Sequence, residues 1–145
     1  MKAIFIHSAD WQLGKPFGGI IDADKQARVR RERIDVLGRL GGLVREREAE
    51  FVLVAGDLFD SINPTNETVA QTFEVIGQMG LPVLAIPGNH DHGGPSGPWE
   101  QDFVLRQIKD MAPNFRVLLN AEPFELDTAI ILPCPLLDKH TAKDP

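Results

Sequence analysis

The sequence predicts an α/β fold in which short buried strands alternate with amphipathic helices around a parallel sheet. Three continuous apolar runs, at residues 3–6, 51–55 and 82–86, are rich in Val, Ile, Leu, Phe or Ala and are followed by polar or glycine-containing segments. Such runs are typical of strands buried on both faces of a parallel sheet. Helical periodicity separates them, so the order strand, helix, strand, helix, strand predicts two consecutive right-handed crossover units.

The first expected helix spans residues 25–48, between the first two strands. Its apolar positions recur at helical spacing and form one stripe on an otherwise charged surface. Glycines at positions 38, 41 and 42 weaken this helix. The stripe consists of Ile34, Leu37, Gly41 and Val44.

The second expected helix lies between the second and third strands, where Val69, Phe73 and Ile76 form another stripe. The segment 63–65, Asn-Pro-Thr, carries capping residues that open a helix, and Gly80 and Pro82 close it. Capping chemistry therefore predicts both ends of this helix.

The last third of the chain changes its pattern. Residues 99–111 predict a third helix with Phe103, Ile108 and Met111 on its inward face. Short apolar runs separated by turns then predict a short β meander or an added sheet. These runs lie at 115–119, 123–126 and 129–132.

Composition indicates one soluble domain of 145 residues, with 43% hydrophobic and 25% charged residues. A net charge of −6 argues against broad attraction to nucleic acid, so any DNA contact is expected to be local. Basic residues between 24 and 50 are mixed with acidic ones and are interpreted as a solvated helix face. Cys134 is the only cysteine, which excludes an intrachain disulfide and fits a reducing cytoplasm. No apolar run is long enough for a signal peptide or a membrane span, so no membrane association is expected.

Potential metal ligands follow each of the three predicted parallel strands: Asp10 and Gln12, then Asp57, then Asn89 and His90. Because parallel strands bring their carboxyl ends to one edge of a sheet, these side chains are expected to converge. Oxygen-rich sites with some imidazole suit hard or borderline divalent ions, and a carboxylate such as Asp57 can bridge two of them. Two ions about 3.5–4 Å apart polarise phosphate oxygens and activate water, so the reaction predicted is phosphoester hydrolysis.

These segments resemble the motifs of the calcineurin-like metallophosphoesterase superfamily, whose pattern is Asp-x-His, then Gly-Asp, then Gly-Asn-His followed by Asp or Glu. The corresponding segments here are 10–12, 56–57 and 88–91, within about the first ninety residues. Their contexts look most like the SbcD-type DNA repair exonuclease subunits. The resemblance implies a layered α-β-β-α sandwich, of which residues 1–145 are expected to be the N-terminal portion of a single domain.

The resemblance also implies a role for each matching residue. Asp10 would ligate the first ion, Asp57 would bridge both ions, and Asn89 would ligate the second. His90 would protonate the leaving oxygen or stabilise the pentacovalent phosphate, with Asp91 orienting it.

Two departures from the family pattern affect this expectation. Gln12 stands where the family has its first histidine, and an amide oxygen is a weaker donor to Zn²⁺ or Fe²⁺ than imidazole. Mn²⁺ is therefore the preferred candidate for the two divalent ions, with Mg²⁺, Fe²⁺ and Zn²⁺ as alternatives. The family also supplies a later lone histidine and a Gly-His-x-His motif that this chain lacks, and His140 is not expected to replace them. We therefore expect the chain by itself to be incomplete or weakly active.

Several residues near the motifs have two interpretations. Lys15 is either a phosphate contact or a solvated loop charge, and His92 either touches a substrate phosphate or is an exposed loop histidine. Asp60 is interpreted either as shaping the metal loop or as an ordinary turn residue.

The function predicted from these features is a metal-dependent phosphodiesterase or nuclease acting on DNA. Two alternatives stay open: a phosphatase or phosphodiesterase for nucleotides or other small substrates, and a non-catalytic scaffold that keeps the fold. The resemblance implies an SbcC-type ATPase as a partner and leaves a homodimer open.

Overall fold

The computed structural model describes residues 2–138, so His140 lies outside the described residues. Four parallel strands form one sheet in which spatial order follows sequence order. The α/β architecture with alternating strands and helices is thus confirmed. The strands are β1 (Phe5–Ser8), β2 (Phe51–Ala55), β3 (Val83–Ile86) and β4 (Phe115–Val117).

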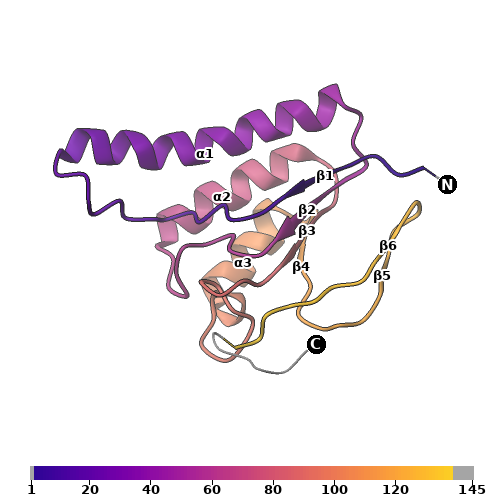
Figure 1. Ribbon diagram of the computed structural model, residues 1–145. Coiled ribbons are helices and arrows are strands. Elements are labelled where there is room, and N and C mark those ends of the chain that lie inside the picture. The colour runs from indigo at the N-terminus through magenta and orange to yellow at the C-terminus, as the bar shows by residue number, and fades with distance from the viewer. Residues whose placement is uncertain (1, 139–145) are drawn as a thin grey trace.

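Three helices cover one face of this sheet and lie side by side, with α2 between α1 and α3 (Figure 1). This placement follows from the consecutive strand order, because right-handed crossovers that all proceed in one direction put every helix on the same face. The helices are α1 (Ala23–Glu46), α2 (Asn66–Met79) and α3 (Asp102–Met111), the last preceded by the 3-10 turn η1 (Pro98–Glu100).

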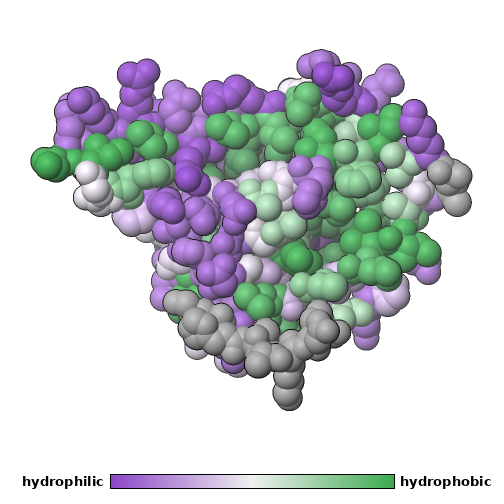
Figure 2. Space-filling view, viewed as in Figure 1, coloured by the Kyte–Doolittle hydropathy of each residue, from purple (hydrophilic) through white to green (hydrophobic). Residues whose placement is uncertain are grey.

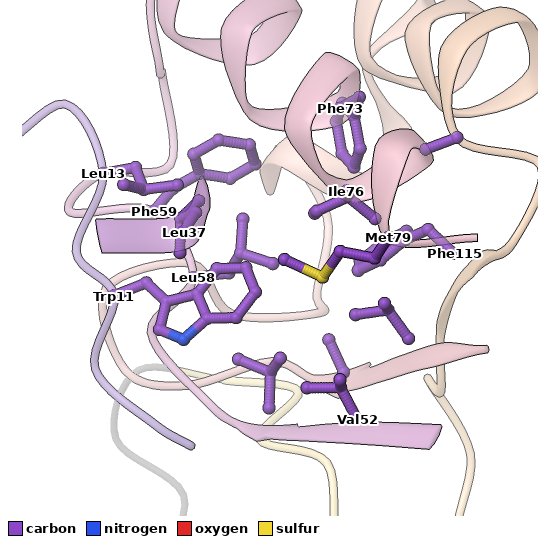
Figure 3. Packing of buried hydrophobic residues seen from close by; sticks show 14 of the residues in the cluster. Trp11, Leu13, Leu37, Val52, Leu58, Phe59, Phe73, Ile76, Met79 and Phe115 are labelled. Carbon is purple, nitrogen blue, oxygen red and sulfur yellow. The ribbon is translucent and has the colours of Figure 1, made fainter. Parts of the chain in front are cut away.

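The core lies between the helices and the sheet. Figure 3 shows Ile76 and Met79 of α2 pointing toward Val52 of β2, with Leu37 of α1 and Phe115 of β4 closing the sides. All five side chains are at most 6% exposed. Burying one such side chain contributes about 1.5–3 kcal/mol.

The ends of α2 confirm the capping prediction. Thr65 is the N-cap, and its hydroxyl accepts a hydrogen bond from the Thr68 N–H at 3.2 Å. Gly80 is the C-cap and adopts the left-handed conformation, with φ of 71°.

Several sequence predictions were wrong in detail. The first strand begins two residues later than expected and is not buried on both faces, since Phe5 is 48% exposed. On α3 the buried residue is Val104, whereas Met111 is 43% exposed. The last third of the chain predicts a meander or an added sheet; its first run, as β4, instead pairs in parallel with β3 and extends the main sheet, whereas the other two runs form a separate two-stranded sheet. Only β5 (Phe124–Glu125) and β6 (Ile130–Ile131) form an antiparallel hairpin.

Among residues 2–138, none of the helices has both the length and the apolar character required to cross a membrane.

Candidate active site at the carboxyl edge of the sheet

The loop after β1 pairs with the loop after β2 beyond the ends of both strands. The Asp10 N–H donates to the Gly56 carbonyl at 3.1 Å, and the Gln12 N–H donates to the Asp57 carbonyl at 2.8 Å. Leu13 and Phe59 continue the contact as a parallel bridge. Two of the predicted ligand segments are therefore held together by their backbones.

Three predicted ligands adopt a backbone conformation that is rare for residues other than glycine. Asp10, Gln12 and Asp57 have φ angles of 54°, 44° and 53°. Each such residue costs on the order of 1 kcal/mol or more, and strain of this kind clusters at functional sites. The hydrogen bonds between the two loops hold these conformations in place.

The loop after β3 joins the other two through Asp57. One carboxylate oxygen of Asp57, Oδ1, accepts the His90 N–H at 3.0 Å, and Asp57 is only 5% exposed. The approach requires glycine: a Cβ atom on Gly88 would overlap the Asp57 carboxylate and its backbone nitrogen. A Cβ on Gly56 would lie 3.2 Å from the Gly88 Cα, closer than ordinary contact. The two glycines thus allow the second and third loops to touch.

Asp91 stabilises the contact between the loops after β2 and β3. Its side chain accepts hydrogen bonds from the Gly88 N–H at 2.8 Å and the Phe59 N–H at 3.1 Å, while the Trp99 indole donates to its backbone carbonyl at 2.6 Å. Asp91 is fully buried, and burial raises the pKa of its carboxyl group although hydrogen bonds from the Gly88, Phe59 and Leu58 backbone oppose that shift. Within residues 2–138, Asp91 makes no hydrogen bond to the His90 ring, so its contacts here are to loop backbones.

His90 is oriented instead by Asp60. The ring Nδ1 lies 3.0 Å from the Asp60 carbonyl oxygen and 3.9 Å from the Asp60 carboxylate oxygen Oδ1. A carbonyl can only accept, so Nδ1 carries a proton and Nε2 is the nitrogen left to exchange one. Oδ1 of Asp60 is buried without a hydrogen-bond partner among the described residues.

Sequence reasoning did not place Asp60 beside His90. The usable signal was a second carboxylate three residues after Asp57 in the same strand-end loop. Turn chemistry explained that residue equally well from sequence alone.

Lys15 also reaches this network. Its ammonium nitrogen donates to Oε1 of Gln12 at 2.9 Å and lies 3.7 Å from Oδ1 of Asp60. The remaining predicted residues are less connected: Asn89 is exposed, and Nδ1 of His92 is buried without a hydrogen-bond partner among the described residues.

The candidate metal ligands offer oxygen atoms rather than imidazole nitrogens, which suits hard divalent cations. The candidate ligands are two carboxylates, Asp10 and Asp57, and two amides, Gln12 and Asn89. Residues 2–138 contain no group of three or more His, Cys, Asp or Glu side chains placed to hold an ion. Oxygen donors of this kind favour Mg²⁺ or Mn²⁺, and the Gln12 oxygen is shared with Lys15.

The fold and the loop cluster together define an α/β protein with an oxygen-rich site at the carboxyl edge of its parallel sheet. The family model for the calcineurin-like phosphoesterases matches residues 4–131, and the chain belongs to this family. Members of the family are generally dependent on two metal ions. The D subunit of nuclease SbcCD from Bacillus subtilis (strain 168) is 32% identical over 91 residues, which cover 60% of this chain and 22% of that protein. The chain thus matches only about a fifth of the length of this relative.

Proposed function

We propose that this protein is a metal-dependent phosphodiesterase that acts on DNA. The observation that carries the proposal is the contact between the second and third strand-end loops, in which Asp57 accepts the His90 N–H at 3.0 Å. This contact supports the proposal because it holds a candidate ligand against the backbone of the loop that carries the candidate proton donor. Similarity to a nuclease subunit supports DNA as the substrate class.

In this proposal Asp10, Gln12, Asp57 and Asn89 hold two divalent ions, with Mn²⁺ preferred. Such ions would supply charge neutralisation at the phosphate and lower the pKa of water. The protein's own contribution is to hold these oxygens near one sheet edge before substrate arrives, since the loops are already joined by backbone hydrogen bonds.

We assign proton transfer to the His90 ring. Its Nδ1–H is held by the Asp60 carbonyl at 3.0 Å, which directs Nε2 away from that contact. The Asp60 carboxylate oxygen Oδ1 lies 3.9 Å from Nδ1 of the ring. Nε2 then donates to the leaving oxygen of the phosphodiester. Asp91 positions the same loop through its backbone contacts.

We also propose that residues 1–145 are the N-terminal portion of a single larger metallophosphoesterase domain. The sheet face opposite the helices supports this, because Phe5 is 48% exposed although its ring stacks on buried Phe51 at 5.1 Å. The apolar residues Ile130 and Leu132 are also 64% and 73% exposed, respectively. Figure 2 shows hydrophobic surface over the β5–β6 hairpin. A second sheet of the α-β-β-α sandwich would cover such a face. The similarity to a nuclease subunit also supports an SbcC-type ATPase partner.

The test compares hydrolysis of bis(p-nitrophenyl) phosphate and of labelled DNA in Mn²⁺ by the chain, its His90→Ala variant and a form extended at the carboxyl end. Arg39→Gln serves as the control, because Arg39 is an exposed residue of α1 paired with Glu32. We expect the extended form to hydrolyse both substrates and His90→Ala to lose at least about a hundredfold in rate.

Hydrolysis of the small ester without cleavage of DNA would favour a phosphatase or phosphodiesterase for small substrates. No hydrolysis by any form, with one ion or none bound, would favour the non-catalytic scaffold. The hydrogen bond between Lys15 and Gln12 is the observation behind that last alternative, since it engages a candidate ligand.

A further inference from the structure

A groove of about 640 Å³ lies between α1, α2 and the loop after β1. This volume falls within the range of about 300–1,000 Å³ that is usual for ligand sites. Its walls carry four basic side chains and two threonines: Lys15, Arg30, Arg31, Arg33, Thr65 and Thr68. Three carboxylates also line the groove, so its basic residues outnumber its acidic ones by one, whereas the whole chain has a net charge of −6.

The Arg33 side chain stabilises one wall of the groove through two contacts. It donates to the Trp11 carbonyl at 2.7 Å, and its guanidinium lies 5.2 Å from the centre of the Phe17 ring. A guanidinium over an aromatic ring is a stabilising contact. Arg33 therefore fixes the loop after β1 against α1 and gives the groove a defined wall.

Arg30 and Arg31, unlike Arg33, are exposed residues of α1. Neither has a carboxylate oxygen within 4.0 Å among residues 2–138. Arg30 donates to the Gln26 side chain, one turn earlier on α1. Their positive charges are thus available to an anion entering the groove.

Lys15 connects the groove with the candidate active site. This side chain lines the groove and also donates to Gln12, one of the candidate ligands. A bound chain that contacts Arg30 and Arg31 would therefore lead to the metal loop.

Acidic residues on the walls show how a ligand would be oriented. Glu67 and Glu74 line the groove from α2, whereas Arg30 and Arg31 line it from α1, where Asp35 follows about one turn later. Carboxylates repel phosphates but accept hydrogen bonds from base amino groups. The α1 wall near Arg31 thus suits phosphates, and the α2 wall suits bases.

We propose that this groove binds a single strand of nucleic acid next to the phosphodiester that is cleaved, with its phosphates on Arg30, Arg31 and Lys15. The inference rests on the proposed function, which it extends by naming the path of the substrate strand. A groove of about 640 Å³ has the size of a small-ligand site, so it admits one strand rather than a duplex.

The experiment measures binding of a fluorescently labelled ten-nucleotide DNA strand by anisotropy, in EDTA and over a range of salt concentrations. The groove variant is Arg30→Gln with Arg31→Gln. The control is Lys25→Gln with Arg28→Gln, which makes the same charge change on exposed positions of α1 that do not line the groove. We expect the groove variant to bind at least about tenfold more weakly and its salt slope to shrink by about 1.4, because each lost phosphate contact removes about 0.7.

A third variant, Arg30→Lys with Arg31→Lys, keeps the charge and is expected to bind within about threefold of the parent. Thermal unfolding of each variant checks that it is folded. Equal losses in the groove and control variants, or no loss in the groove variant, would overturn the proposal. Because binding is measured without metal, the result does not depend on hydrolysis. Failure of every form, the extended one included, to cleave a phosphodiester would refute the proposed function, while the groove comparison still stands or fails by itself.

Discussion

Substitution of Gly88 by alanine tests whether close contact between two loops is what builds the site. The added Cβ would meet the Asp57 carboxylate and the Asp57 backbone nitrogen at distances that real atoms do not adopt. Neither can move cheaply, because Asp57 is buried and its Oδ1 already accepts the His90 N–H. Overpacking of this kind costs about 1–3 kcal/mol, so we expect the free energy of unfolding to fall by about 2 kcal/mol. For a chain of this size the melting temperature would fall by about 6 °C.

The assay is urea denaturation of Gly88→Ala alongside Gly42→Ala, with hydrolysis of bis(p-nitrophenyl) phosphate measured in parallel. Gly42 lies in α1, and a Cβ atom added there would have no neighbour within 4 Å, so alanine at this position is expected to raise the free energy of unfolding by about 0.5–1 kcal/mol. We expect only Gly88→Ala to lose activity, because only it displaces Asp57. A Gly88→Ala protein as stable and as active as the parent would refute the reasoning.

Three further predictions concern single contacts. Asp91→Ala leaves the Gly88 and Phe59 N–H groups without their acceptor, so the free energy of unfolding measured in urea should fall by about 3 kcal/mol, whereas Asp91→Asn keeps one acceptor and should lower it less. The reverse order would contradict the role of Asp91 in stabilising these loops. Asp60→Asn keeps the carbonyl contact to His90 but removes the carboxylate that lies 3.9 Å from the ring Nδ1. We expect slower hydrolysis of bis(p-nitrophenyl) phosphate, and an unchanged rate would count against a role for this carboxylate. Hydrogen bonds from the Thr128 side chain and the Ile4 N–H lower the pKa of Glu50, so its stabilising contribution is present above its ordinary pKa and is lost as pH falls through the lowered value. In melting temperatures measured over a series of pH values, Glu50→Gln should reduce the loss of stability at acid pH, and equal acid sensitivity in both proteins would exclude the effect.

Local sequence signals predicted the parts of the fold that depend on neighbouring residues. The apolar run at 51–55 matches β2, and Thr65 caps α2 as its position after Asn-Pro indicated. The convergence of the loops followed from strand order alone, and backbone hydrogen bonds from Asp10 and Gln12 join two of them. These features are set by short-range chemistry and by one topological rule.

Features that depend on distant contacts could not be predicted. Residues 115–117 pair with β3 because α3 returns the chain to that edge, and their apolar run alone does not distinguish this from a meander. The orientation of His90 depends on a carbonyl thirty residues earlier in the sequence. Lys15 was expected to meet either phosphate or solvent, and its contact with Gln12 depends on the turn between them.

The loop after β1 links the candidate metal site to the groove, and Trp11 anchors that loop to β1 and α1. Its ring is 7% exposed and donates to Ser8 Oγ at 2.9 Å, while its carbonyl accepts from Arg33 at 2.7 Å. Asp10 and Gln12 flank this anchored residue, so both are held in their left-handed conformations before any ligand binds. The same Arg33 forms the wall of the groove against Phe17. One anchored segment therefore fixes the candidate metal ligands and one wall of the strand path, which would keep the scissile phosphate in register with the groove.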